Sequence, residues 1–213
     1  FFNLSDRKLI TVEVPVEYQL SVINQVQVNY LIGLTFANIL MSILRQAPNV
    51  IMIGEIRDHE TAEIAVHAAL TGHLVFSTLH TNDAPGAVTR LIDQGVVPFL
   101  VASSVIGIQA QRLVRTICKK CKEPFMPDDK MLRAVKLTSE QMKNAQFMKG
   151  KGCDNCNGTG YRGRLCIIEL VMMDDSIRTL IYKKASSTSI RKRARELGMR
   201  TLREDGIQKV LSG

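Results

Sequence analysis

Three continuous apolar runs in the first half of the chain predict strands that are buried on both faces. These runs are LITVEV at 9–14, VIMIGEI at 50–56 and HLVFSTL at 73–79. Segments with the periodicity of amphipathic helices lie between and after them. This alternation is typical of α/β folds, in which helices connect the strands of a mostly parallel sheet.

Two of the helical segments carry recognisable boundaries. Apolar residues within 36–44 recur at the spacing of one helix face, and Thr35 stands where a side chain can cap the first turn. The segment at 59–72 is rich in small residues, with Asp58 as the expected N-cap and Gly72 as the C-terminal stop. Further helices are expected at 84–94, 98–115, 187–197 and 201–211.

The residue composition of the chain changes near residue 117. Beyond it, Cys, Gly, Lys and polar residues replace the strand and helix pattern, until two short basic helical segments follow near the end. We therefore expect three regions, which are an α/β core at 1–117, a small cysteine module at 118–166 and a helical region at 167–213.

Four cysteines form two C-x₂-C pairs, Cys118 with Cys121 and Cys153 with Cys156, and 31 residues separate the pairs. Two residues between ligands let both sulfurs of a pair reach one ion, and four thiolates complete the tetrahedral site that zinc prefers. The long separation predicts an inserted loop or helix. Structural zinc is the favoured interpretation, with two disulfides or free thiols as the alternative. Cys166, in the strand-like RLCIIEL, is expected to be a small buried hydrophobe.

Polar residues gather where two of the predicted strands end. Glu55 follows the apolar run at 50–53, while the next run has His73 at its entrance and Thr78 and His80 at its exit. If the two strands are neighbours, Glu55 and the exit residues converge at one edge of the sheet. A carboxylate there can polarise a water or hold Mg²⁺, and the imidazole and hydroxyl can contact a terminal phosphate. Taken singly, Glu55 also fits an ordinary charged strand end, and His80 an interfacial histidine.

The size and charge of the chain narrow the classes of function. The 213 residues are 46% hydrophobic and 23% charged, enough to bury a core and a second small unit. A net charge of +8 permits contact with nucleic acid or an anionic membrane, but 5% aromatic residues and no Trp give little for bases to stack on. The longest apolar stretch, 96–108, is interrupted by Pro98 and Gly107, so no membrane-spanning helix is expected.

Several motifs together resemble the hexameric secretion ATPases that drive type II secretion and type IV pilus assembly. The stretches are ITVEVPVEY, IGLTF, LRQAPNVIMIGEIRD, ETAEIAVHAALTGHLVFSTLHTNDA, AQRLVRTIC and GCDNCNGTGYRGR, and they extend over essentially the whole chain. The resemblance implies a RecA-like P-loop ATPase core without its phosphate-loop strand and helix, followed by a tetracysteine zinc module and C-terminal helices. Because that module is missing from the retraction branch of the family, the resemblance also argues against a retraction motor.

The resemblance assigns roles to the site residues. VIMIGEIRD corresponds to an atypical Walker B motif, with Gly54 where most P-loop enzymes have Asp and Glu55 as the catalytic acid that orients the attacking water. His73 and His80 belong to the His box of the family, and His80 is the one expected to face the terminal phosphate. Arg57 and Thr78 are expected near the nucleotide.

The Asp box of the family, whose acidic residues help hold Mg²⁺, corresponds to ITVEVPVEY. It departs from the usual pattern because Val14 replaces an Asp, although Glu13 and Glu17 remain. In addition, no G-x-x-x-x-G-K-[ST] occurs in these 213 residues, and in the family that loop lies just upstream of them. The start lacks an initiating Met and a signal-peptide pattern, as expected of a piece of a longer protein. We therefore expect the piece alone to hydrolyse no measurable ATP.

For the full protein the resemblance implies a homo-hexameric ring that hydrolyses ATP with Mg²⁺ between adjacent subunits. The ring would be cytoplasmic and peripheral at the inner membrane, where it acts on a platform protein and a cytoplasmic adaptor, and on pilin-like subunits indirectly. No specific nucleic acid is expected. The motifs are shared by the secretion and assembly branches, so they do not separate the two.

Two other interpretations remain open at this point. One is a non-catalytic nucleotide-binding relative of the same machinery, motivated by Val14, and the other is a basic zinc-containing nucleic-acid-binding module. The basic residues of the last helices are expected to form mainly a solvated face, and they are Arg191, Lys192, Arg193, Arg195, Arg200 and Arg203.

Overall fold

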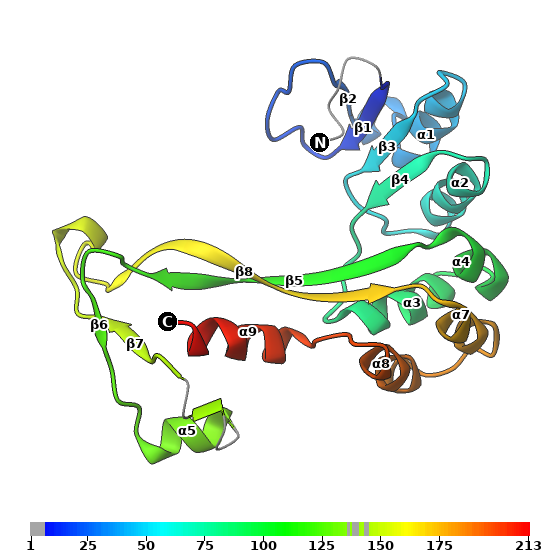
Figure 1. The fold of residues 1–213 in the computed structure, drawn as a ribbon. Coiled ribbons are helices and arrows are strands. Elements are labelled where there is room, and N and C mark those ends of the chain that lie inside the picture. Colours follow the sequence, from blue (N-terminus) through cyan, green and yellow to red (C-terminus); the bar gives the residue numbers. More distant parts are fainter. Residues whose placement is uncertain (1–6, 136, 138–140, 143–144) are drawn as a thin grey trace. The chain divides into compact units, whose positions relative to one another are not determined.

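The computed structural model describes residues 7–135, 137, 141–142 and 145–213 (Figure 1). It contains two compact units. Unit 1 comprises Phe1–Ile108 with Val171–Glu196, and unit 2 comprises Gln109–Leu170 with Leu197–Gly213. The three regions expected from the sequence, 1–117, 118–166 and 167–213, stay a prediction.

Unit 1 contains a parallel four-stranded sheet with the order β2-β1-β3-β4. Its strands are β1 (Leu9–Glu13), β2 (Asn24–Gln27), β3 (Val50–Ile53) and β4 (Leu74–Ser77). The α/β class is confirmed, and a strand forms within each of the three apolar runs. The expected burial on both faces is wrong for β4, whose residues are half-buried or exposed because it lies at the edge of this sheet. The sequence pattern missed β2 because NQVQ is polar and half-exposed, as an edge strand can be.

Helices pack beside this sheet and against one another (Figure 1). They are η1 (Tyr30–Ile32), α1 (Phe36–Leu44), α2 (His59–Leu70), α3 (Ala84–Asp93), α4 (Pro98–Ser104), α7 (Asp175–Tyr182) and α8 (Ser187–Glu196). The predicted caps are confirmed, since Thr35 accepts a hydrogen bond from Asn38 N and Asp58 accepts one from Thr61 N. Helix α1 contacts β1 and α2 contacts β4, so both cover the sheet that carries the candidate site.

The single helix expected at 98–115 is wrong. Helix α4 ends at Ser104, and the strand β5 (Gly107–Ile117) follows. Ile108 and Ala110 alternate with glutamines, which is the period of a strand, and the partner strand β8 (Tyr161–Met172) lies far along the sequence. A local reading of helical periodicity could not detect this pairing.

Unit 2 contains most of the two-stranded sheet of β5 and β8, together with a small antiparallel pair. Its remaining elements are β6 (Lys122–Pro124), α5 (Asp129–Val135), β7 (Met148–Gly150), η2 (Asp154–Cys156) and α9 (Leu202–Leu211). The insertion expected between the cysteine pairs, a loop or a helix, contains the helix α5. Asp205 of α9 is buried and accepts a hydrogen bond from Ile168 N at 2.9 Å, which fixes α9 on β8.

Cys166 is only half-buried, because its strand β8 belongs to a two-stranded sheet with little cover, so the expected fully buried side chain is corrected. Across the described residues we find no helix with the length and apolar character needed to span a membrane.

Candidate functional site

The carboxyl ends of β3 and β4 meet at one edge of the sheet of unit 1. Ile53 pairs with Ser77 in parallel register, so the residues that follow both strands emerge side by side. Two hydrogen bonds join these exits, from Ile56 N to Thr78 O at 3.0 Å and from Thr78 Oγ1 to Gly54 O at 2.6 Å. Thr78 therefore fixes the start of the β4 exit loop against the end of β3.

Glu55 is the centre of a charged cluster at this edge. Its Oε2 lies 3.0 Å from Nε2 of His80 and 2.6 Å from Nε of Arg57. The Glu55 side chain is 15% exposed, whereas that of His80 is 77% exposed. The structure thus brings together Glu55, Arg57, Thr78 and His80, and it leaves the imidazole open to an approaching ligand.

The carboxyl group of Glu55 is held in its ionised form. Burial by itself would raise the pKa of Glu55, but the hydrogen bonds and positive charges of Arg57 and His80 together outweigh burial and lower it. Glu55 is consequently an anion at neutral pH. An ionised carboxylate is suited to accept a proton from water or to orient it.

Glu13 ends the neighbouring strand β1 and is itself positioned. Its Oε1 accepts hydrogen bonds from Thr11 Oγ1 at 2.5 Å and from Gln25 Nε2 at 3.0 Å. Gln25 also contacts the backbone of the loop after β1, through Tyr18 O at 3.0 Å and Leu20 N at 2.7 Å. Sequence reasoning missed Gln25, because it lies on the polar strand that the apolar pattern did not reveal.

Gly54 allows β3 to lie close to β1. Its N–H donates to Val12 O at 2.7 Å, and a Cβ at this position would lie only 3.1 Å from the same oxygen and 3.5 Å from Cα of Glu13. Because β1 is an inner strand of the sheet, it has little freedom to move away. The missing side chain therefore brings the end of β3, and Glu55 after it, next to Glu13.

Two predicted residues are placed elsewhere in unit 1. His73 precedes β4, so the length of that strand, at about 3.3 Å per residue, separates it from the edge that carries Glu55. The His73 ring lies 3.0 Å from Ala68 O and 3.1 Å from Thr71 Oγ1 at the end of α2. Glu17 is exposed in the loop between β1 and β2. The structure therefore does not bring His73 together with Glu55.

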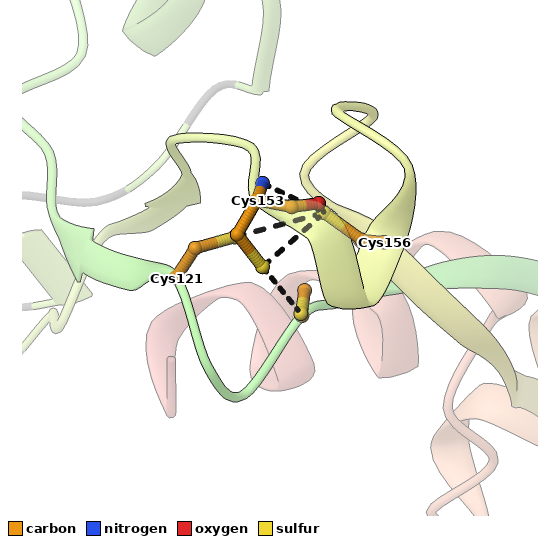
Figure 2. A group of neighbouring side chains, drawn as sticks. Cys121, Cys153 and Cys156 are labelled. Atoms are coloured by element: carbon orange, nitrogen blue, oxygen red, sulfur yellow. Dashed lines mark hydrogen bonds between the residues drawn. The ribbon is translucent and has the colours of Figure 1, made fainter.

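The four cysteines of the C-x₂-C pairs form a compact cluster in unit 2. Their sulfur atoms all lie within 4.8 Å of one another, with separations of 3.9 Å for Cys118 to Cys153 and Cys121 to Cys156, and 3.8 Å for Cys153 to Cys156. Tetrahedral zinc with Zn–S bonds of about 2.3 Å requires sulfurs about 3.8 Å apart. Figure 2 shows three of these side chains, Cys121, Cys153 and Cys156, converging from two segments. Disulfide sulfurs would lie about 2.05 Å apart, so this geometry fits a metal and not a pair of disulfides.

Several N–H groups point at these sulfurs. Asn155 Nδ2 donates to Cys118 Sγ at 3.3 Å, and the backbone amides of Cys153 and Gly160 donate to Cys156 Sγ at 3.2 Å each. Burial raises the pKa of Cys121 to about 12, whereas the hydrogen bond from Asn155, together with weaker contributions from other donors, lowers the pKa of Cys118 to about 6. Such donors stabilise thiolates, which are the form that binds zinc.

The backbones of Gly150 and Gly160, which flank the second cysteine pair in the sequence, lie in close contact. A Cβ on Gly150 would lie 2.0 Å from Gly160 O, and a Cβ on Gly160 would lie 2.5 Å from Gly150 O. Gly160 O in turn accepts a hydrogen bond from Cys118 N at 2.9 Å. These contacts therefore link β7, β8 and the first cysteine pair.

We expect Gly150→Ala to destabilise unit 2 by about 3 kcal/mol or more, because backbone atoms and not flexible side chains oppose the new methyl group. The matched control is Gly206→Ala in α9, where the nearest atoms lie 3.8 Å away and the change should be neutral or stabilise by about 0.5–1 kcal/mol. Thermal unfolding of both variants compares them. Equal melting temperatures would show that the backbones of Gly150 and Gly160 are not in tight contact.

Comparison with known proteins finds similarity to proteins of type II secretion and type IV pilus assembly. The family model described as "Type II/IV secretion system protein" matches residues 1–213. The type IV pilus assembly ATPase PilB of Thermus thermophilus is 52% identical over 98% of this chain and 23% of that protein. The type II secretion system protein E of Pseudomonas aeruginosa is 50% identical over 99% of this chain and 41% of that protein. The chain thus spans well under half the length of these relatives.

Solved structures agree on the fold. The pilus retraction motor PilT with bound ADP is 27% identical, with a TM-score of 0.57 over 93% of this chain and 51% of that chain. The ATPase DotB of Legionella pneumophila is 23% identical, with a TM-score of 0.63 over 97% of this chain and 48% of that chain. The second likeness shows the fold alone.

Proposed function

Because this chain belongs to the family of type II/IV secretion system proteins, we propose that it supplies the hydrolytic part of the nucleotide site of a motor ATPase. The motor would power type II protein secretion or type IV pilus assembly, as the names of its relatives indicate. The observation that carries this proposal is the Glu55 cluster, an ionised carboxylate held by Arg57 and His80 at the carboxyl edge of a parallel sheet.

In the proposed reaction, Glu55 orients a water molecule for attack on the terminal phosphate of ATP and accepts its proton, while the bond from that phosphate to the bridging oxygen breaks and ADP leaves. His80 is proposed to contact that phosphate and to stabilise the charge that develops on it, which its exposure and its distance of 3.0 Å from Glu55 support. Arg57 keeps Glu55 ionised. Thr78 holds the two strand ends together, because its hydroxyl donates to the backbone oxygen of Gly54 and its own carbonyl accepts from Ile56 N.

Glu13 would help hold the Mg²⁺ that accompanies ATP, and Mg²⁺ would neutralise charge on the phosphates. Thr11 and Gln25 share one oxygen of Glu13, so they orient the carboxyl group. Glu17 is exposed in the adjacent loop, and we retain it as a second acidic group near the nucleotide. We propose that His73 belongs to the His box of the family. It precedes β4 and therefore lies at the opposite end of that strand from Glu55.

The phosphate cradle is proposed to come from sequence upstream of residue 1. These 213 residues contain no G-x-x-x-x-G-K-[ST], and the relatives are more than twice as long as the chain. Backbone N–H groups and the Lys of that loop would bind the phosphates of ATP. The chain extended upstream through this loop is called the extended chain below.

We propose that Cys118, Cys121, Cys153 and Cys156 hold one structural Zn²⁺. A closed four-thiolate site has no open position for substrate, so its effect is to join the end of β5 to the segment before β8.

The extended chain is proposed to assemble as a homo-hexamer that is cytoplasmic and peripheral at the inner membrane. Its proposed partners are an inner-membrane platform protein and a cytoplasmic adaptor, with pilin-like subunits engaged indirectly. The distribution of charge supports an anionic contact for unit 2, which has 16 Lys and Arg against 8 Asp and Glu, whereas unit 1 has 12 of each.

The proposal predicts saturable, Mg²⁺-dependent ATP hydrolysis by the extended chain, in particles with the mass of a hexamer. Phosphate release and light scattering on the same sample measure the two properties. A nucleotide-binding protein without turnover, or turnover that does not depend on Mg²⁺, would contradict the proposed site.

A further inference from the structure

The loop that carries His80 is fixed at both of its ends. At its start, Thr78 is bonded to the end of β3 through its side chain and its carbonyl. At its end, Asp83 caps α3 by accepting a hydrogen bond from Gly86 N at 2.8 Å. His80 lies between the two anchors, so the position of its ring depends on both of them.

The second anchor is tied to a helix more than one hundred residues away in the sequence. Arg191 of α8 places its Nη2 2.5 Å from Asp83 Oδ2, while Oδ1 of the same carboxylate makes the cap. Both side chains are partly buried, and α8 packs against α3. Arg191 therefore uses the oxygen that the cap leaves available.

Neighbouring residues of α8 show that this contact is specific to Arg191. Lys192 is exposed, and Arg193 turns to a different helix, where its Nε donates to Ser176 Oγ at 2.7 Å. Ser176 in turn donates to Asp174, the N-cap of α7. Arg191 and Arg193 thus serve two different helix starts, and only that of α3 leads into the His80 loop. These two residues are therefore not part of the mainly solvated basic face that the sequence predicts.

We propose that Arg191 is a positioning residue of the site, which keeps His80 against Glu55 by fixing Asp83. This inference rests on the proposed ATPase function. It assigns α8, which follows the zinc module in the sequence, a part in setting the geometry of the hydrolytic edge of unit 1.

The test uses two variants of the extended chain, each of which removes the ion pair between Arg191 and Asp83. Asp83→Asn preserves the cap of α3, because Asn is also a good N-cap residue. Arg191→Met preserves the packing of α8, because Met has about the length of the apolar stem of Arg. We expect each variant to lower kcat by about 3- to 30-fold, with KM for ATP changed by less than about twofold, because phosphate binding is assigned to the upstream loop. The double variant should be no slower than the slower single one, since both remove the same contact.

Arg193→Met is the matched control for loss of an arginine contact on the same helix. It should lower the melting temperature at least as much as Arg191→Met does, yet leave kcat within about twofold of the parent. Any one of three results would overturn the positioning role of Arg191. Arg191→Met could have the kcat of the parent, or the losses of the two single variants could add in the double variant. Arg191→Met and Arg193→Met could also lose equal amounts of kcat. If instead the parent itself shows no turnover, the proposed function fails before this inference is reached.

Discussion

Replacing Glu55 with Gln in the extended chain is expected to lower kcat for ATP hydrolysis by about 10²- to 10⁴-fold, the range that a general base contributes. Gln keeps the volume of the side chain and a carbonyl oxygen for Arg57 and His80, whose nitrogens lie 2.6 and 3.0 Å from the present carboxylate. It lacks the negative charge needed to accept a proton from water. Nucleotide binding should persist, since the phosphate cradle is assigned to the upstream loop.

Phosphate release measures the change in kcat, and titration with a fluorescent ATP analogue measures binding. Glu63→Gln is the matched control, because Glu63 is a half-exposed glutamate of α2 in the same unit. That control should hydrolyse ATP at the parental rate. Turnover by Glu55→Gln within about tenfold of the parent would remove Glu55 from the role of base.

The lowered pKa of Glu55 adds a pH dependence to this account. Because Arg57 and His80 keep the carboxyl ionised, the acid limb of the parental pH–rate profile should lie below the ordinary range for Glu. Removing the charge in Arg57→Ala would raise the pKa of Glu55 and move that limb to higher pH.

Cys156→Ser should have the second large effect, the loss of zinc and of the fold around it. Cys156 Sγ lies 3.8 and 3.9 Å from two other sulfurs and accepts two backbone N–H groups. A serine hydroxyl cannot replace a thiolate as a zinc ligand under ordinary conditions, and zinc contributes about 10–16 kcal/mol to the folding of small zinc modules. We therefore expect unit 2 to lose its cooperative unfolding transition.

Elemental analysis of the purified extended chain should find one zinc per parent chain and almost none in Cys156→Ser. Cys166→Ser is the control, because Cys166 lies outside the four-sulfur cluster. This variant should contain as much zinc as the parent. A parent that carries no metal, or a variant that retains a full equivalent, would contradict the zinc site.

Local signals accounted for the parts of the structure that depend on nearby residues. Apolar runs predicted β1, β3 and β4, and the caps at Thr35 and Asp58 followed from residue type and position. The cysteine spacing predicted the cluster because both members of each pair lie in one tight turn.

Features that depend on distant partners were missed. The strand β5 forms with β8, whose residues begin more than forty positions later, and the strand period of Ile108 and Ala110 was overlooked at the end of a helix. Gln25 orients Glu13 from an edge strand that has no apolar signature. The contact of Arg191 with Asp83 requires two helices to pack, which no spacing along the sequence reveals.

The most direct test of the central proposal is steady-state ATP hydrolysis by the extended chain, with the parent and Val14→Asp measured side by side. Val14 is 47% exposed just after β1, so an Asp there adds charge near Glu13 without disturbing the core. If the chain belongs to a working motor, the parent hydrolyses ATP and Val14→Asp changes the rate by no more than a few-fold. If Val14→Asp hydrolyses ATP and the parent does not, the proposed motor function is contradicted. The natural protein would then be a nucleotide-binding relative without turnover.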